Sequence, residues 1–457
     1  MKAHRPALAR RHFLTGLLAL GALAPAAAFA QSSAAIKRGT LLGSDFGIVP
    51  DGEADQSALF QKAVDAAATA GLALVLAGGR YTASNVQIPA GCTIIGAAGA
   101  AEINAARDEP IFVADGQPGI VLQNLHFQGI SQDSGAGDGR SGLLAFKGCE
   151  NLQLTGLRLG TGHGNGLYLD GCSGRITGSD FTNFQAAGIF AINSRDLTFA
   201  QNRVTNCGNG GILIWRDEAG RDGTIVTANH ISEIYARDGG SGQNGNGINV
   251  FRADNVIISD NVIDNCAFSA VRVNTGKNTA IRGNTCTNSG EIALYSEFAF
   301  SGSVIANNIV DGAAGGISIT NLDQGGRLAV CTGNIVRNIL PRSAANPDVT
   351  PFGIYAEADT TITGNSIDSV PGIGIVGGVG TFLRNVVIAS NVVSGVHIGI
   401  GVSVVDGAGA VQVSGNIVSG ATEHGIVGLR WNDIASDDLV RDAGKFPGVV
   451  VSGNTVA

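Results

Sequence analysis

Ser259-Asp260-Asn261-Val262-Ile263, followed by Ala270-Val271-Arg272-Val273, is one instance of a phrase that returns about every two dozen residues from Asn151 to the end of the chain. In other instances the second run begins with Gly-Ile, as at Gly211-Ile212 and Gly425-Ile426. A unit this short cannot bury its own apolar face, whereas stacked units can bury a continuous one. The repeat therefore predicts a solenoid, in which the outward side chains of stacked strands form columns.

The composition agrees with a single elongated domain. Glycine accounts for 68 of the 457 residues, about twice its usual share, and it falls at fixed places in the repeat, as turns with a positive φ require. Asn stands beside Gly at the same turn, where stacked Asn side chains can hydrogen-bond along the axis. Charged residues make up only 14% of the chain, which leaves ample apolar surface for a long core.

The N-terminus carries the pattern of an export signal. Arg10-Arg11-His12-Phe13-Leu14 matches the twin-arginine motif, and an apolar stretch leads to Ala28-Phe29-Ala30, a small-residue cleavage site. We therefore expect residues 1–30 to be a signal peptide that engages the twin-arginine translocon, and the mature protein to be periplasmic or extracellular. An uncleaved membrane anchor is the alternative.

Charge and cysteine content exclude several classes of partner. Cleavage after Ala30 removes four basic residues and no acid, which takes the formal net charge from −8 to −12 and argues against nucleic acid. The seven cysteines include no C-x-x-C pair, so no zinc site is predicted. Cys149 and Cys172 lie about one coil apart, and either a disulfide or two small core residues would explain them. We predict no metal and no cofactor.

The N-terminal part of the mature chain differs from the repeats. Residues 31–44 look like a linker. Residues 55–70 form the one convincing amphipathic helix, with Leu59, Phe60, Ala63, Val64 and Ala67 on one face and Gly71 at its end. Such a helix would cover the open end of a solenoid, where backbone groups would otherwise pair with another chain.

This module resembles a known superfamily. The run Asp45-Phe46-Gly47-Ile48-Val49-Pro50-Asp51-Gly52 before the helix, and Gly79-Arg80-Tyr81 and Gly91–Gly96 after it, are similar to the N-terminal module of pectate-lyase-like proteins. The twin-arginine leader together with the Gly-Asn repeat also resembles a bacterial family of twin-arginine-translocated β-helix repeat proteins without an assigned activity. The resemblance covers residues 45–457 and implies a fold rather than a function.

The expected fold is accordingly all-β. It is a single-stranded right-handed parallel β-helix with three strands per coil, about 11–13 coils and an N-terminal capping helix. We assign residues 45–110 to the cap module, made of the helix and the first strands, and residues 111–457 to the β-helix repeats.

The insertions cluster at equivalent positions in successive coils. Ser131–Gly142, Ala236–Asn246 and Leu340–Phe352 fall just before the Gly-Ile strand, and Arg216–Gly223 and Asn321–Gly326 fall just after it. Loops at equal places in successive coils project from the same edge of a solenoid. The sheet of Gly-Ile strands is therefore expected to be the floor of a groove with a wall on each side.

Alternation along these strands indicates which side chains face outward. The outward set is rich in aromatic and polar residues, and we interpret it as a substrate-binding surface: Tyr168, Asp170, Trp215, Asn249, Phe251, Asn274, Tyr295, Tyr355 and Glu357. Aromatic rings on a groove floor suit the C–H faces of sugar rings, while polar groups bind the hydroxyls. The alternative is that these rings are ordinary cross-strand pairs.

The candidate catalytic residues are Arg272, Glu297 and Asp217. Arg272 and Glu297 are expected mid-groove on adjacent coils, where an arginine could act at a carbon acidified by a uronate and a carboxylate could act as acid or base. A glycosidase would need two carboxylates that face each other across the sugar bond. A weak ion pair is the alternative interpretation of Arg272 and Glu297. Gly162-His163-Gly164 matches a polygalacturonase motif, but the aspartate-rich motifs expected upstream of it are absent.

Two classes of function follow. The leading hypothesis is an exported β-helix protein that binds a polysaccharide or oligosaccharide in the groove and, in its enzymatic version, cleaves it as a lyase or hydrolase. The alternative is a non-catalytic cell-envelope or structural repeat protein. The chain ends on an expected strand at Val449–Val456 with no capping helix, which favours end-to-end self-association through an uncapped C-terminal coil.

Overall fold

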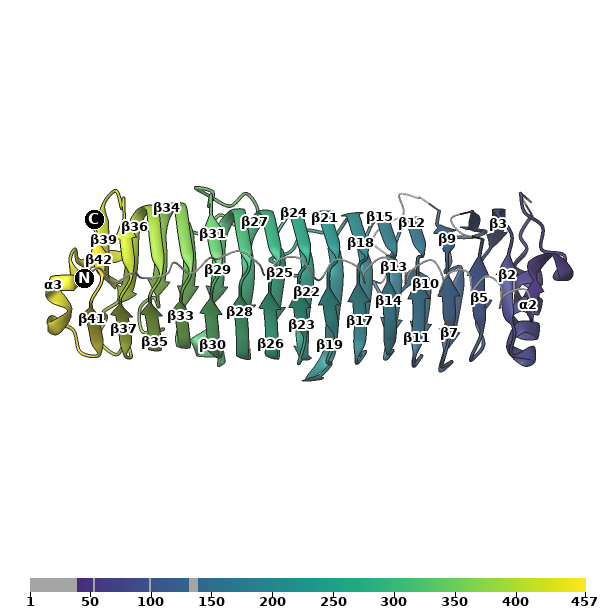
Figure 1. Cartoon of the computed structure of the whole chain (residues 1–457), viewed down its shortest axis with the longest axis horizontal. Coiled ribbons are helices and arrows are strands. Elements are labelled where there is room, and N and C mark those ends of the chain that lie inside the picture. The colour runs from purple at the N-terminus through teal and green to yellow at the C-terminus, as the bar shows by residue number, and fades with distance from the viewer. Residues whose placement is uncertain (1–38, 52–53, 98–99, 131–138) are drawn as a thin grey trace, which may run out of the picture.

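The computed structural model is a long rod of stacked coils, with one helix at each end (Figure 1). It describes residues 39–51, 54–97, 100–130 and 139–457. The proposed signal peptide, most of the proposed linker and residues 131–138 lie outside the described residues. The chain winds as a right-handed parallel β-helix of about 14 turns. Within the described residues, no helix has the length and apolar character needed to cross a bilayer.

Each coil contributes strands to three parallel stacks, of which the first is a continuous 16-stranded sheet, here called sheet 1. Its strands, in stacking order, are β1 (Thr40–Leu42), β2 (Ala73–Leu76), β5 (Thr93–Gly96), β8 (Val121–Gln123), β11 (Leu152–Thr155), β14 (Gly174–Thr177), β17 (Leu197–Ala200), β20 (Ile225–Thr227), β23 (Ile257–Ser259), β26 (Lys277–Arg282), β28 (Ser301–Ala306), β30 (Arg327–Thr332), β33 (Ala358–Thr363), β35 (Arg384–Ala389), β37 (Val411–Ser414) and β41 (Val449–Ser452).

The second stack, sheet 2, follows sheet 1 along the chain in every coil from β2 onward. Its strands are β3 (Gly79–Ala83), β6 (Ala101–Ala105), β9 (Leu125–Gln128), β12 (Arg158–Gly162), β15 (Asp180–Phe184), β18 (Arg203–Cys207), β21 (His230–Ile234), β24 (Val262–Cys266), the first parts of β27 (Thr285–Glu297) and β29 (Ile309–Ile319), β31 (Ile335–Arg337), the first parts of β34 (Ser366–Gly377) and β36 (Val392–Ser403), β38 (Ile417–Ser419) and β42 (Thr455–Val456).

The third stack contains the Gly-Ile strands and is called the groove sheet below. Its strands are β4 (Val86–Gln87), β7 (Phe112–Asp115), β10 (Gly142–Lys147), β13 (Asn165–Asp170), β16 (Ala187–Ile192), β19 (Gly210–Arg221), β22 (Asn246–Asp254), β25 (Val271–Asn274), the second parts of β27 and β29, β32 (Phe352–Ala356), the second parts of β34 and β36, and β39 (His424–Arg430). A short strand, β40 (Asp433–Ser436), pairs antiparallel with β39.

Aliphatic side chains that point inward stack on one another along the rod. In the groove sheet, Ile189, Ile212, Ile248 and Val271 are consecutive strand partners, and all four are fully buried. Because neighbouring strands lie about 4.8 Å apart, each coil covers the apolar face that the previous one would leave exposed. The core is therefore one continuous column, as the repeat predicts.

A ladder of asparagine side chains runs along the turn between sheets 1 and 2. Each Nδ2 before the last rung donates to the Oδ1 of the asparagine one coil further on, at 2.9–3.0 Å. The ladder consists of Asn202, Asn229, Asn261, Asn284, Asn308, Asn334, Asn365, Asn391, Asn416 and, as the last acceptor, Asn454. The same Oδ1 atoms also accept backbone N–H groups, as Asn308 does from Asn284. The ladder satisfies buried turn groups that would otherwise have no partner and confirms the expected axial bonding.

The N-terminal end is covered by α2 (Ser57–Ala70), which buries Phe60, Ala63, Val64 and Ala67. Gly71 ends the helix with φ 65°. The predicted capping helix is thus confirmed, with Gln56 at the N-cap position. The linker boundary needs a correction, because Thr40–Leu42 form β1, pair with β2 and belong to sheet 1. A 3-10 helix, η1 (Gly43–Phe46), connects β1 to the cap.

The C-terminal end also carries a helix, contrary to the prediction from the sequence. After β40, α3 (Leu439–Asp442) and the 3-10 turn η3 (Ala443–Lys445) lie between β39 and β41 in the chain, at the end of the rod (Figure 1). Leu439 is fully buried, and the Asp438 side chain accepts the Arg441 backbone N–H. The insertion supplies its own apolar anchor, so the last coil is not left uncapped.

Candidate functional site

The outward residues of the groove sheet form two parallel rows. In the first row, Tyr168, Phe190, Leu213, Asn249, Arg272, Tyr295, Ser318 and Tyr355 are consecutive strand partners. In the second row the consecutive partners are Asp170, Ile192, Trp215, Phe251, Asn274 and Glu297. The unbroken register in these coils brings residues about two dozen positions apart next to one another.

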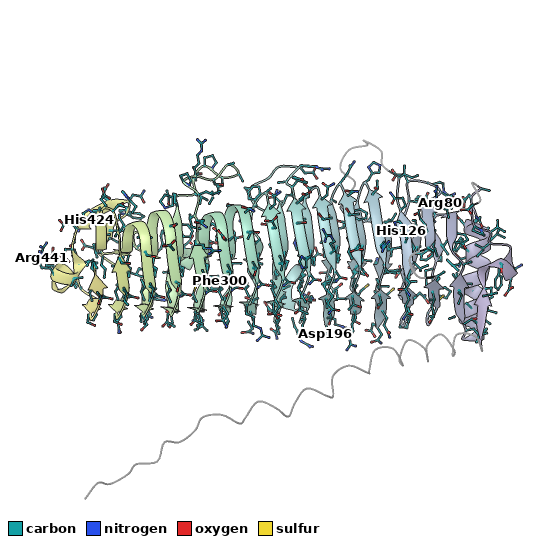
Figure 2. All side chains as sticks on the ribbon, turned by 45° about the horizontal axis from the view of Figure 1, so that its top comes forward. Arg80, His126, Asp196, Phe300, His424 and Arg441 are labelled. Atoms are coloured by element: carbon teal, nitrogen blue, oxygen red, sulfur yellow. The ribbon has the colours of Figure 1, made fainter. Side chains whose placement is uncertain are left out.

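Loops rise from one edge of the groove sheet (Figure 2). Residues 235–245 connect β21 to β22, and residues 338–351 connect β31 to β32. In the first loop, Gln243 O accepts the Asn249 side-chain amide at 3.4 Å. The second loop is attached to the floor by Ser343 Oγ, which donates to Gly290 O at 2.6 Å. These two segments form the wall on this edge of the groove.

The opposite edge is built differently from the sequence-based expectation. Residues 216–223 were expected to be a loop, but β19 continues through them to Arg221. The register between β19 and β22 moves from Trp215–Phe251 directly to Gly220–Ala253, so residues 216–219 bulge outward. Further along, η2 (Leu322–Gln324) forms the edge within residues 321–326. Of the loop at 131–142, only residues 139–142 are described.

Aromatic rings cover the floor of the groove from Tyr168 to Phe251. The ring centroids lie 5.7 Å apart for Tyr168–Phe190, 5.2 Å for Phe190–Trp215 and 5.9 Å for Trp215–Phe251, all in edge-to-face arrangements. Tyr168 and Phe190 are buried, whereas Trp215 and Phe251 are partly exposed. The rings are therefore cross-strand pairs, and those of Trp215 and Phe251 also offer a surface to a ligand.

Trp215 lies between two pockets. One, here called the arginine pocket, has a volume of about 440 Å³ and is lined by residues that include Gln243, Phe251, Arg272 and Glu297. The other, the aromatic pocket, has about 420 Å³ and is lined by residues that include Asn165, Phe190 and Asn209. The Nε1 atom of Trp215 is buried and has no hydrogen-bond partner within the described part of the chain. Its N–H is a buried donor that no described residue uses.

Arg272 is held by two buried glutamates. Its Nε and Nη2 donate to the two carboxylate oxygens of Glu297 at 2.7 and 2.9 Å, and Nη1 donates to Glu291 Oε2 at 3.2 Å. The Arg272 Cζ lies 5.0 Å from the centroid of the Tyr295 ring. Asn274 adds a bond from Nδ2 to Glu297 Oε1 at 3.0 Å. The arginine is 9% exposed and each glutamate 2%, so this is a buried network rather than a surface ion pair.

The electrostatics keep this arginine protonated. Burial alone would lower the pKa of Arg272, but the Glu297 bonds and the charge of Glu291 outweigh it, and the pKa is raised. Burial raises the pKa of Glu291 despite its contacts with Asn346 and Arg272. Burial also raises the pKa of Tyr295 to about 12. Arg272 therefore serves as a fixed cation that holds two carboxylates, and proton abstraction by it is disfavoured.

Tyr355 and Glu357 form a second polar group further along the floor. The Tyr355 hydroxyl donates to Glu357 Oε1 at 2.6 Å, and the Leu322 backbone N–H donates to Oε2 at 2.7 Å. Burial raises the pKa of the Glu357 carboxyl. In the first row, Ser318 lies between Tyr295 and Tyr355 and separates this group from Tyr295 by one strand. Neither residue lines the arginine pocket.

Asp217 lies on the bulge after Trp215. Its carboxylate accepts the Asn193 side-chain amide at 2.9 Å and pairs with Arg140 at 3.2 Å. The Asn193 bond, with Arg140, lowers the pKa of Asp217. The structure thus brings Arg272 and Glu297 together and gives Asp217 other partners. Asp170 lies two rungs before Trp215 in the second row, next to Lys147 on one side and Ile192 on the other.

Glu291, Asn346 and Gly242 complete the site, and the sequence analysis missed them. Glu291 lies where the register of β27 against β29 shifts between Ser289 and Ile292, so simple alternation cannot place its side chain. Asn346 reaches it from the loop after β31, donating to Glu291 Oε1 at 2.9 Å. The available signal was the extra Gly290-Glu291 pair before the strand, a local break in the repeat.

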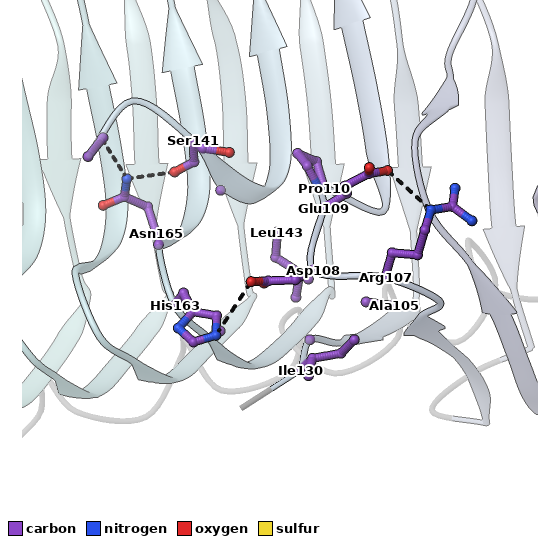
Figure 3. Close-up of a pocket in the computed structure, with 15 residues that line it drawn as sticks. Ala105, Arg107, Asp108, Glu109, Pro110, Ile130, Ser141, Leu143, His163 and Asn165 are labelled. Atoms are coloured by element: carbon purple, nitrogen blue, oxygen red, sulfur yellow. Dashed lines mark hydrogen bonds and ion pairs between the residues drawn. The ribbon is translucent and has the colours of Figure 1, made fainter. Parts of the chain in front are cut away.

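A third, smaller pocket of about 190 Å³ contains the Gly162-His163-Gly164 motif (Figure 3). His163 Nε2 lies 3.7 Å from Asp108 Oδ2, and Glu109 turns toward Arg107 instead. Asn165 donates to the carbonyls of Gly139 and Ser141 at 2.9 and 2.7 Å. Asn165 thus anchors the segment that precedes β10. Among the described residues, no three His, Cys, Asp or Glu side chains are grouped as metal ligands would be.

Comparison with known proteins identifies the fold. Residues 165–325 match the family model described as "Right handed beta helix region". The chain as a whole folds as a right-handed β-helix. This agrees with the resemblance to pectate-lyase-like proteins drawn from the N-terminal module. No curated protein matches the sequence.

Solved structures of similar shape share little sequence with this β-helix. The catalytic unit of a thermostable GH87 α-1,3-glucanase from Streptomyces thermodiastaticus strain HF3-3 has 14% identity and a TM-score of 0.51, over 92% of this chain and 69% of that one. Pre-mature gene product 12 of bacteriophage phi29 has 14% identity and a TM-score of 0.50, over 91% and 60%. The surface adhesin PfbA of Streptococcus pneumoniae has 16% identity and a TM-score of 0.48, over 87% and 94%. At such identities the likeness concerns the fold.

Proposed function

We propose that this β-helix binds a polysaccharide along the groove sheet, with the arginine and aromatic pockets as neighbouring subsites. The observation that carries the proposal is the position of Trp215, which lines both pockets and has a buried N–H without a partner in the described chain. A ligand that fills both pockets must lie across the Trp215 side chain, which lines both. A chain of sugar residues has the required length, apolar ring faces and hydroxyl acceptors.

The walls and the fold support the same proposal. The loop at residues 235–245 contributes Ser241, Gly242 and Gln243 to the arginine pocket and Asn244 to the aromatic pocket, so a single loop borders both. The fold is also that of an α-1,3-glucanase, a protein that acts on a polysaccharide. We further propose that the twin-arginine leader exports the protein to the periplasm or beyond, where such polymers are found.

The chain contains only two tryptophans, Trp215 and Trp431, which allows a direct test. In a Trp431→Phe variant of residues 31–457, Trp215 is the sole tryptophan, and its fluorescence should change saturably when a panel of glycans is titrated. In the otherwise unchanged protein, Trp215→Ala should weaken binding at least about tenfold because the ring's contact area and its donor are both lost. Trp215→Phe keeps a ring without the N–H and should fall in between.

Trp431→Ala is the matched control. Trp431 is 52% exposed and belongs to the C-terminal insertion rather than to the groove, so this variant should bind as the unchanged protein does. Thermal unfolding should show that each variant remains folded. Wild-type affinity in Trp215→Ala, or no glycan binding at all, would contradict the proposal and favour the non-catalytic structural role.

Cleavage is a second candidate function, favoured by the carboxylates of Glu291 and Glu297 on the floor beside the arginine pocket. New reducing ends would indicate a hydrolase, and an ultraviolet-absorbing unsaturated product would indicate a lyase. Either product should disappear in Glu297→Gln while binding at the aromatic pocket persists. Product formation that is unchanged in Glu297→Gln would exclude this carboxylate from the chemistry.

A further inference from the structure

We infer that the arginine pocket accepts an uncharged sugar residue and disfavours a uronate. This inference rests on the proposed function and specifies its substrate class. The arginine at the centre of a groove suggests at first a partner for an acidic sugar. The contacts of Arg272 lead to the opposite conclusion.

The two glutamates bind three of the five N–H groups of the Arg272 guanidinium, and one face of the guanidinium is covered. Glu297 takes Nε and one Nη2 hydrogen in a bidentate pair, and Glu291 takes one Nη1 hydrogen. The Tyr295 ring lies 5.0 Å from Cζ. Gly242, in the loop at residues 235–245, lies so close that a Cβ at this position would overlap the guanidinium. A ligand carboxylate could take the Nε–Nη2 edge of this arginine only by displacing Glu297, which a buried bidentate pair resists.

The charge balance around the pocket also disfavours an anion. Among the described residues, Arg272 and Glu297 are the only charged ones that line it, and Glu291 contacts the same guanidinium from outside the lining. With Glu291 ionised the cluster carries one excess negative charge, and with Glu291 protonated it is neutral. In neither state does this cluster leave a cation for the ligand. Arg252, outside the lining, lies over the Phe251 ring with Cζ 4.7 Å from its centroid and donates to Asp217 O. A uronate carboxylate would lose its hydration and lie near Glu297 without compensation.

The other groups that line the pocket suit hydroxyl groups. Gln243, Asn249 and Asn274 carry side-chain amides that both donate and accept, and Trp215 adds its N–H donor. Neutral hydroxyls also donate and accept, so they can bond to this set without a net charge. The exposed Arg237 belongs to the rim of the aromatic pocket, so the inference concerns the arginine pocket alone.

The test compares neutral hexose oligomers with uronic-acid oligomers of equal length, using Trp215 fluorescence in the Trp431→Phe protein. The neutral oligomers should bind at least about tenfold more tightly. Uronate binding should strengthen when the salt concentration rises from about 20 to about 200 mM, because salt screens the repulsion from Glu291 and Glu297. A uronate bound by a free arginine would instead weaken with salt, so the sign of the salt effect separates the two models.

Charge-removing variants provide the second readout. Glu291→Gln should reduce the discrimination against uronates at least about threefold, because it removes a negative charge while the amide can still accept from Arg272. Asp442→Asn removes the same charge from a buried acid of the C-terminal insertion, so it is the matched control and should not alter discrimination. Uronates that bind as tightly as neutral oligomers would overturn the inference alone. If neither class binds, the proposed function fails, and the inference fails with it.

Discussion

At the scale of single residues, Gly242 determines how closely the wall loop approaches the floor of the groove. Its backbone has φ 125°, a conformation that residues with a Cβ rarely adopt, and it lies directly over the Arg272 guanidinium. The adjacent Asn246 side chain donates to Gly242 O at 2.8 Å and holds the loop in this place. The shape of the arginine pocket therefore depends on the absence of one methyl group.

We expect Gly242→Ala to displace either the loop or the guanidinium, since the new Cβ would occupy the same space. Glycan affinity, measured by titration, should fall at least about tenfold, and the thermal unfolding midpoint should drop. Gly239→Ala in the same loop is the control, because its φ is 66° and a Cβ there meets nothing within 4 Å. It should cost only the left-handed backbone strain of about 1–2 kcal/mol. Equal loss of affinity in both variants would show that the contact with Arg272 is unimportant.

At the scale of structural elements, the asparagine turn connects every coil from β18 onward to the next one. Asn308 shows the pattern: its Nδ2 donates to Ile281 O at 2.9 Å and to Asn334 Oδ1 at 3.0 Å, while its Oδ1 accepts the Asn284 backbone and side-chain N–H groups at 3.0 Å. Each rung therefore satisfies groups of both neighbouring coils. This continuity keeps the rows of the groove sheet in register.

Asn308→Ala should lower the unfolding free energy by several kcal/mol, because buried groups of Asn284 and Ile281 lose their partner at about 1–3 kcal/mol each. Asn454→Ala removes the last rung, where the turn is partly exposed and water can replace the side chain, so its effect should be smaller. Urea denaturation of both variants measures the difference. A larger loss for Asn454→Ala would mean that the ladder does not act through burial.

At the scale of the whole molecule, a stack of parallel strands ends in two unpaired faces, and a helix lies at each. At the N-terminal end, Phe60 of α2 is fully buried and packs at ring-centroid distances of 6.0 Å from Tyr81 and 6.4 Å from Phe112. At the other end, Leu439 of α3 is the buried anchor. Self-association through the C-terminal end would have to accommodate this helix.

Phe60→Asp should detach α2, because a carboxylate cannot be buried against the aromatic rings without a partner. The exposed edge of the first coils should then pair with other molecules, and light scattering coupled to size exclusion should reveal soluble oligomers or aggregates. Ala58→Asp places the same charge on the exposed face of the same helix and should leave the oligomeric state unchanged. A Phe60→Asp protein with wild-type stability and size would contradict the capping role of α2.

The repeat and its alternation were enough to determine the coil, the inward aliphatic column and the common face of Tyr168, Arg272 and Tyr295. The helical spacing of apolar residues within 55–70 was enough to determine the capping helix α2. The physical reason is that a parallel stack converts a sequence period directly into vertical contacts, so local spacing determines which residues become neighbours. The roles assigned to these residues in catalysis and substrate binding stay predictions.

Only the tertiary structure decided which charges surround Arg272 and what closes the two ends. Glu291 enters the site through a register shift, Asn346 reaches it from a loop that begins two coils further along, and Gly242 covers the guanidinium from another insertion. The helix α3 likewise arises from an insertion whose apolar anchor is a single leucine. Loops and bulges do not follow the period, and their positions depend on contacts between residues far apart in the chain.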